Sequence, residues 1–372
     1  MDFDLTDEQL MLREAARRFA REHNAFEERR RVLASVDGFS RSAWSAYADM
    51  GWLALGLPED VGGLNCSFVE TTLLVEEFGR VLALEPYVSS AILCARIVDR
   101  SGSERHRAML LPALAEGKVL LALAHNEGSS REEYARIGTS AVAVGNNFVI
   151  DGRKMLVFDA PAADYFIVSA RIGADFSLFL VPRSSGGLRV DGYRLIDGTS
   201  AADLTLQGVQ VPAGGLLAEP ARAHEVLDEA LDRAVLAQIA EALGAMETVL
   251  EITTNYLKQR IQFGQPIGKF QALQHRMSEM FVEVQETRSM LFRGLAYLEE
   301  SPAARASAIS AAKIVATNAA RFVGTQGIQL HGGIGMTEEY AVGHFYKKLT
   351  VFEKQYGDSE FHLKRFLLRE RD

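Results

Sequence analysis

The chain is poor in the residues that build covalent or metal-held frameworks. It has two cysteines, Cys66 and Cys94, in 372 residues. Two cysteines are too few for a disulfide framework, and no CxxC or Cys/His cluster with zinc spacing occurs. We therefore predict no metal site. The 9 prolines and 31 glycines are too few for a collagen-like or low-complexity chain.

Basic charge is also in short supply. Lysine and arginine number 40 against 49 acidic residues, which gives a net charge of −9. That balance argues against nucleic acid or an anionic membrane as the main partner. The opening residues are acidic and lack the apolar run of a signal peptide, and no stretch reaches the roughly 18 apolar residues that span a bilayer. These absences predict a cytoplasmic protein.

Several catalytic and nucleotide-binding motifs are missing from the sequence. It has no GxGxxG, no GxxxxGK[ST], no GxSxG and no HExxH, so a nucleotide-binding α/β domain has no support. The histidines are scattered. We interpret His275 and His331, which lie beside other motifs, as packed or hydrogen-bonded residues and not as ligands.

The apolar spacing that is present divides the chain into three parts. Thr6 and Gln9 form a capping-box pattern before a helical segment that ends near Arg31. Further helices are predicted over 41–50, 68–81, 88–98 and 104–116. From Val119 short apolar runs replace this spacing, with a hairpin signal at 145–147, and no helix separates the predicted strands. Helical spacing returns over 227–260, 270–298, 302–323 and 338–348.

This order predicts an α+β fold. It comprises an N-terminal helical domain (1–118), a middle antiparallel β barrel or sandwich (119–215) and a C-terminal helical bundle (216–372).

Two C-terminal strings carry candidate binding residues. In the first, from Arg260 to Gln271, a helix delivers a cation, an amide and an aromatic ring and then breaks. That set can hold a phosphate and stack on a heteroaromatic ring, although an ordinary helix end with the phenylalanine in the core is the simpler interpretation. The second string runs from Gln329 to Tyr340 and contains glycines that let a backbone approach a ligand closely. Its alternative is a turn with Thr337 as a helix cap.

Together, and in this order, the two strings resemble the acyl-CoA dehydrogenase family of flavoproteins. The segments 5–9, 51–53, 57–59 and 62–64 also match, as does the α–β–α order. The resemblance implies FAD at a dimer interface, α,β-desaturation of an acyl-CoA thioester and an electron-transferring flavoprotein as acceptor. It also implies an adenine-side set of Arg260, Phe263, Gln262 and Gln271, and a second set that approaches from a partner subunit: Gln329, Gly332 and Gly333.

The family's catalytic base has no obvious counterpart in this sequence. The family carries it in a Tyr-Glu-Gly-Thr string, and here Tyr356 occupies the position of the glutamate. A phenol with a pKa near 10 is a poor base. Three acidic residues remain as candidate bases: Asp232, which lies two residues too early in its helix, Glu241, whose helix face of small residues could border a cleft, and Asp358. For Glu241 the simpler interpretation is a hydrated or salt-bridged side chain.

The strings that face the flavin in the middle domain also differ from the family pattern. The family string Thr-Glu-Pro-Gly-x-Gly-Ser is replaced here by Asn126-Glu127-Gly128-Ser129-Ser130-Arg131. Asn126 can still bond the flavin edge. Phe158 replaces the threonine of Trp-Ile-Thr-Asn and cannot donate its hydrogen bond. Arg131, Arg153 or Lys154 could meet a distal substrate carboxylate, although surface charge explains each more simply.

These changes resemble one branch of the family, the small subunit of pimeloyl-CoA dehydrogenase and related hetero-oligomeric enzymes. The resemblance implies a homologous large subunit that supplies the base. It also implies CoA thioesters of dicarboxylic, branched or ring-bearing acids as substrates. Two alternatives remain open: a self-sufficient homo-oligomer with a displaced base, and a non-catalytic acyl-CoA-binding or scaffold subunit.

Overall fold

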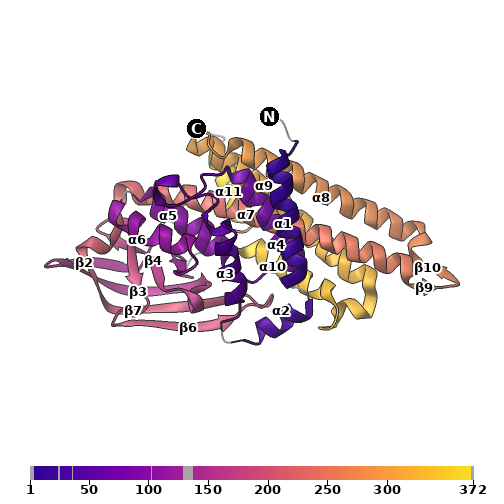
Figure 1. Ribbon diagram of the computed structural model, residues 1–372, viewed down its shortest axis with the longest axis horizontal. Coiled ribbons are helices and arrows are strands. Elements are labelled where there is room, and N and C mark those ends of the chain that lie inside the picture. Colours follow the sequence, from indigo (N-terminus) through magenta and orange to yellow (C-terminus); the bar gives the residue numbers. More distant parts are fainter. Residues whose placement is uncertain (1–3, 24–25, 36, 102, 129–136, 370–372) are drawn as a thin grey trace. The chain divides into compact units, whose positions relative to one another are not determined.

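The computed structural model describes residues 4–23, 26–35, 37–101, 103–128 and 137–369. Its contacts group into two compact units, each assembled from separated segments. The first unit comprises Met1–Arg31, Phe68–Ala83 and Val235–Asp372, and the second comprises Val32–Ser67 and Leu84–Ala234. We describe each unit by itself; Figure 1 locates their elements. The division into three domains stays a prediction.

The second unit is built on one sheet, in the strand order β6-β7-β3-β2-β4-β5-β8 with β1 also pairing β4. The longest ladder joins β3 to β7, which lie side by side with β6 in Figure 1. Ile150, Leu204 and Val209 are fully buried beneath it. The strands of this sheet are β1 (Leu121–Ala124), β2 (Ser140–Val144), β3 (Asn147–Phe158), β4 (Tyr165–Ile172), β5 (Asp175–Pro182), β6 (Leu188–Arg194), β7 (Ser200–Pro212) and β8 (Leu216–Ala218).

The sheet is not wholly antiparallel, which corrects the sequence-based prediction. β1 pairs β4 in parallel over its four residues, and β2 meets β4 in parallel at Ser140 and Arg171. Both faces of β4 are buried over five consecutive residues, so its sequence begins with an apolar run that carries no information about strand direction. The short strands β6 and β8 were not predicted, because β6 is polar and mostly exposed.

The second unit also contains helical segments besides a buried π-helical stretch, Tyr87–Cys94. They are α3 (Arg41–Asp49), α5 (Ala95–Arg100) and α6 (Glu104–Ala115). Ser40 caps α3 by accepting a bond from the Ala43 amide at 3.2 Å, as its position predicted. The Tyr87 hydroxyl donates to the Trp52 carbonyl at 2.8 Å, which fixes the start of the π-helical stretch.

The first unit is a helical bundle. The capping box is confirmed, since the Gln9 amide donates to Thr6 Oγ1 and the Thr6 amide to Gln9 Oε1. Helices α8 and α9 lie side by side, and α10 and α11 pack on α9 (Figure 1). The helices are α1 (Asp7–His23), α2 (Phe26–Leu33), α4 (Phe68–Val81), α7 (Pro220–Gln259), α8 (Gln271–Tyr297), α9 (Pro302–His331), α10 (Ala341–Lys354) and α11 (Ser359–Arg369). α2 and α7 each cross the boundary between the units.

Two helix ends differ from the prediction. α9 continues to His331, past the predicted end at Val323, because it is buried along much of its length and needs no amphipathic pattern. α11 was not predicted at all. Among the described helices, none combines the length and the apolar character needed to cross a membrane.

Helices α4 and α7 cross at two glycines within the first unit. A Cβ added to Gly79 would lie 1.9 Å from the carbonyl oxygen of Glu241, and one added to Gly244 would lie 1.9 Å from that of Glu76. The small-residue face of α7 that bears Glu241 therefore packs against α4. At Gly244 this face is packed, although the sequence suggested that it could border a cleft.

Candidate active site

The first string folds as a helix end followed by a tight hairpin. Gln262 and Gln265 pair across it, and Phe263 and Gly264, with φ of 53° and 78°, form its two-residue turn. Phe263 is a non-glycine residue in the left-handed region, and its ring is 91 % exposed. The interpretation of this phenylalanine as a core residue is therefore wrong. A strained, uncovered aromatic residue is typical of a binding surface.

Arg260 lies at the base of the same hairpin. Its carbonyl accepts the Ile267 amide at 2.8 Å, while its side chain is exposed. Within the described part of the chain no carboxylate forms an ion pair with its guanidinium. Gln262 and Gln271 are also exposed. The hairpin thus offers an exposed cation and an apolar ring to an anionic, aromatic ligand.

The second string ends α9 in an open glycine turn. Gly332 adopts φ 66° and ψ −143°, a conformation that glycine alone accommodates. A Cβ at Gly332 or Gly333 would meet no atom within 4 Å, so the backbone is bare to a ligand. Gln329 is exposed one turn earlier.

The two strings lie at the same end of the bundle. The Tyr256 ring lies 4.6 Å from that of His331, which joins the last turns of α7 to the glycine turn. Arg276 Nη1 donates to Gln326 Oε1 at 2.5 Å, which joins the start of α8 to the end of α9. Both strings therefore lie at one end of the bundle, and the approach of the second string from a partner subunit, which the resemblance implies, stays a prediction. His331 Nδ1 bonds the Gly327 carbonyl at 2.7 Å, as expected for a packed histidine.

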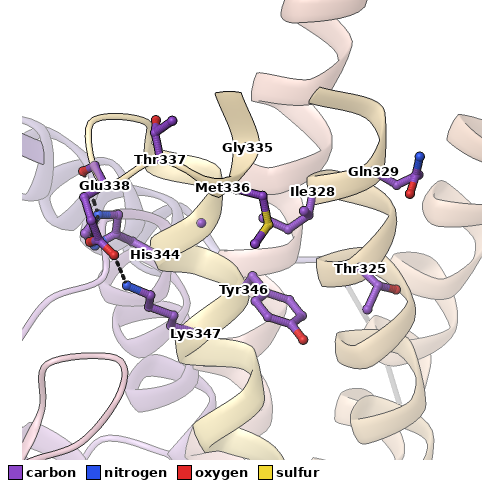
Figure 2. A pocket seen from close by; sticks show the side chains of 11 residues that line it. Thr325, Ile328, Gln329, Gly335, Met336, Thr337, Glu338, His344, Tyr346 and Lys347 are labelled. Atoms are coloured by element: carbon purple, nitrogen blue, oxygen red, sulfur yellow. Dashed lines mark hydrogen bonds and ion pairs between the residues drawn. The ribbon is translucent and has the colours of Figure 1, made fainter. Parts of the chain in front are cut away.

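A cavity of about 310 Å³ lies beside the glycine turn. Figure 2 shows Met336 and Ile328 above the Tyr346 ring, with Gln329 on the neighbouring helix. Lys347 and His344 both reach Glu338 at its rim. The cavity thus lies at the exposed end of the bundle. Its walls are apolar and its rim is charged.

The position of the family's base is a tight turn between α10 and α11. Tyr356 has φ 51° and Gly357 φ 104°. His362 Nε2 bonds the Tyr356 carbonyl at 3.2 Å, and Lys313 Nζ donates to the Phe352 carbonyl at 2.6 Å. Both side chains are buried. Two buried side chains therefore hold the turn and the end of α10 through bonds to backbone carbonyls.

Burial, together with the neighbouring Lys313 ammonium, lowers the pKa of His362 to about 3. An unfolded histidine has a pKa near 6.5, so only the unfolded chain binds this proton between pH 6.5 and 3. The stabilisation is complete above pH 6.5 and is lost on acidification, at about 1.4 kcal/mol per pH unit.

We therefore expect the wild type to lose about 2 kcal/mol more than His362→Gln between pH 6.5 and 5. Glutamine can still donate to the Tyr356 carbonyl without titrating. Urea unfolding at the two pH values measures the difference. Equal losses in the two proteins would contradict this role of His362.

Glu241 forms a buried ion pair. Its Oε1 lies 2.9 Å from Lys348 Nζ, and the two side chains are 12 % and 8 % exposed. The salt-bridged interpretation of this glutamate is the one the structure shows. Its carboxylate therefore holds a neighbouring ammonium within the bundle.

The other two candidate bases are a helix cap, Asp358, and a buried side chain, Asp232. Asp358 Oδ1 accepts the amides of Glu360 and Phe361, both at 3.1 Å, and so caps α11. Asp232 lies on the part of α7 that belongs to the second unit and is only 1 % exposed. In the structure Glu241 is thus ion-paired and Asp358 caps a helix, and the identity of the base stays a prediction.

The flavin-facing candidates lie in the second unit. Asn126 is exposed after β1, and its carbonyl accepts the Met155 amide at 2.8 Å. Phe158 ends β3 and precedes Asp159, which has φ 57° and accepts a bond from Ser89 at 2.5 Å. Arg131, with Ser129 and Ser130, lies outside the described residues. The string that starts at Asn126 is therefore anchored to the irregular end of β3.

The two basic residues of β3 are not free surface charges. Arg153 pairs with Asp203 at 2.8 Å. Lys154 is fully buried and lies 2.5 Å from Glu127, which corrects the surface interpretation. Sequence reasoning missed this pair and that of Glu241 with Lys348, although a lysine in an alternating β segment could have drawn attention to Lys154.

Comparison with known proteins identifies the family. Models of the acyl-CoA dehydrogenase N-terminal, middle and C-terminal domains match residues 6–118, 122–209 and 224–368. The probable acyl-CoA dehydrogenase YngJ of Bacillus subtilis (strain 168) is 28 % identical over 371 residues, 97 % of each chain. The three domain models belong to one family, follow one another from N-terminal to C-terminal, and cover nearly the whole chain.

Solved structures share the fold over the full length. A variant of the steroid acyl-CoA dehydrogenase Tcur3481-Tcur3483 is 28 % identical with a TM-score of 0.90, over 98 % of both chains. A structure described as the electron transferring flavoprotein of Acidaminococcus fermentans is 26 % identical with a TM-score of 0.92, over all of both chains.

The exposed end of the bundle fits the FAD on which this family depends. The exposed guanidinium of Arg260 suits a pyrophosphate, the bare ring of Phe263 suits an adenine, and the open backbone at Gly332 and Gly333 allows close approach. The chain therefore belongs to the acyl-CoA dehydrogenase family, the FAD-dependent oxidoreductases that act on the CH–CH bond of acyl-CoA.

Proposed function

We propose that this chain is the smaller subunit of a hetero-oligomeric acyl-CoA dehydrogenase, close to the small subunit of pimeloyl-CoA dehydrogenase. It contributes dinucleotide contacts and the fold, and a homologous large subunit contributes the base. The observation that carries the proposal is the state of the candidate bases. Tyr356 stands where the family has glutamate, Glu241 is paired with Lys348, and Asp358 caps a helix.

The family reaction requires a base, so the replacement of the family's glutamate by Tyr356 bears directly on the mechanism. Desaturation takes a proton from the carbon α to the thioester, and FAD, when bound, accepts the hydride from the β carbon. A carboxylate must accept the α proton as the hydride departs. Tyr356 is a poor replacement for that carboxylate, because an ordinary phenol has a pKa near 10.

The retained residues support a half-site, that is, a chain that supplies cofactor contacts while its partner supplies the base. They do not support a chain that has simply lost its activity. Arg260, Phe263, Gln262 and Gln271 would hold the adenine half of FAD, and Gln329, Gly332 and Gly333 would approach the same dinucleotide from a partner subunit. Asn126 would bond the flavin edge. The exposed ring of Phe263 and the open backbone at Gly332 and Gly333 support this assignment.

Two relatives support the proposed partners. The steroid acyl-CoA dehydrogenase at 28 % identity carries a two-component name, Tcur3481-Tcur3483. The other bears the name of an electron transferring flavoprotein. We infer a homologous large subunit and an electron-transferring flavoprotein as acceptor. The substrates would be CoA thioesters of dicarboxylic, branched or ring-bearing acids.

Co-expression with a homologous large-subunit candidate tests the proposal. We expect the two chains to co-purify with flavin and to dehydrogenate acyl-CoA thioesters together. The matched arm is this chain expressed alone under the same conditions. A homo-oligomer with full activity would overturn the proposal and return Asp232 to consideration as the base. A colourless complex would favour a scaffold subunit.

A further inference from the structure

A buried polar cluster lies beneath the segment that carries Asn126. Lys154 has no exposed surface. Its ammonium donates to Glu127 Oε1 at 2.5 Å, to Ser169 Oγ at 3.0 Å and to the His125 carbonyl at 3.3 Å. All three donors of the ammonium are therefore used. The Ser169 hydroxyl also bonds His125 Nδ1 at 2.9 Å.

Glu127 extends this cluster to the far end of the same segment. Its Oε2 accepts the Gly138 amide at 2.5 Å, and its Oε1 accepts the Thr139 amide at 3.0 Å. These amides lie eleven and twelve residues further along the chain. One carboxylate thus ties together the two ends of the segment, and Lys154 supplies its counter-charge.

The cluster fixes both neighbours of Asn126. Lys154 holds the His125 carbonyl on one side and the Glu127 carboxylate on the other, and the Met155 amide holds the Asn126 carbonyl itself at 2.8 Å. The backbone of Asn126 is therefore bonded to β3 while its side chain is exposed. Asn126 Oδ1 accepts the Gly128 amide at 3.2 Å, which orients the side-chain amide group.

We propose that Lys154 is a positioning residue for the flavin: through Glu127 it holds Asn126 where its amide can bond the flavin edge. The inference rests on the proposed contact of Asn126 with FAD. A buried lysine is costly, and an apolar residue of similar size would fill the space without that cost. The ammonium is explained by what it holds, because no apolar side chain can bond a carbonyl, a hydroxyl and a carboxylate at once.

Lys154→Met tests the proposal, with Lys154→Arg as the conservative variant that keeps the charge. We expect Lys154→Met to weaken FAD binding about tenfold or more, since it removes charge-assisted bonds. We also expect a changed visible circular dichroism of the bound flavin. Lys154→Arg should recover most of both signals. Arg260→Ala serves as the contrast, because it should weaken binding without altering the flavin spectrum.

Glu127→Gln identifies the route through which Lys154 acts. If the lysine positions Asn126 through Glu127, the double variant should bind FAD no more weakly than Lys154→Met alone. Amide hydrogen exchange at Gly138 and Thr139, measured without flavin, should speed up in Lys154→Met. Unchanged exchange and unchanged flavin binding in that variant would overturn the inference. If the wild type does not bind FAD, that result counts against the proposed function. The hydrogen exchange at Gly138 and Thr139 then still tests whether Lys154 holds this segment.

Discussion

Arg260→Ala is expected to raise the dissociation constant of FAD by about 10- to 100-fold. The guanidinium is exposed at the base of the hairpin, and no carboxylate of the described chain neutralises it. A hydrogen bond to a charged group contributes about 1.5–3 kcal/mol, which corresponds to that range. Quenching of flavin fluorescence on titration with the purified protein measures the constant.

Arg293→Ala is the matched control for this prediction. Arg293 is an exposed arginine on α8 of the same bundle, so its removal changes the net charge equally without touching the hairpin. We expect it to bind FAD as the wild type does. Full flavin occupancy in Arg260→Ala, or an equal loss of FAD affinity in both variants, would contradict the assignment of FAD binding to this end of the bundle.

Glu241→Gln is expected to reduce the free energy of unfolding by about 3–5 kcal/mol, because it leaves the Lys348 ammonium buried beside a neutral amide. We expect the rate of dehydrogenation by the assembled enzyme to stay within about twofold below the unfolding transition, since we propose that the large subunit supplies the base. Urea unfolding and steady-state kinetics on the same preparation measure the two effects.

The double variant Glu241→Gln/Lys348→Met separates the two roles of this glutamate. It removes both charges, so most of the lost stability should return. A structural pair predicts that stability recovers while the rate never changes. A thousandfold loss of rate in a folded Glu241→Gln enzyme would show instead that Glu241 takes the proton.

Much of the fold could be predicted from local patterns. The capping box at Thr6 and the N-cap at Ser40 formed as predicted, because each bond joins residues three apart in sequence. The parallel pairing of β1 with β4 could not be predicted, since it joins residues more than forty positions apart. Likewise α9 passes Val323 because its neighbours bury it on most sides, and no periodicity marks its end.

The candidate site shows the same division. The two strings were recognised from residue types, and the structure brings them to one end of the bundle. The partners in the ion pairs of Glu241 with Lys348 and of Glu127 with Lys154 could not be predicted, although the position of Lys154 in an alternating β segment was a signal. Each joins two elements that are distant in sequence, and a charged residue on a helix or strand is usually solvated. Burial, which only the packed fold reveals, gave these residues their roles.

The most direct test is the visible absorption spectrum of this chain purified alone and supplied with FAD, before and after addition of acyl-CoA thioesters. Because Tyr356 replaces the base and Glu241 and Asp358 are held in structural bonds, we expect a flavin band that no thioester bleaches. Bleaching should appear once a homologous large subunit is present. Bleaching by the chain alone would show a self-contained dehydrogenase and would contradict the half-site.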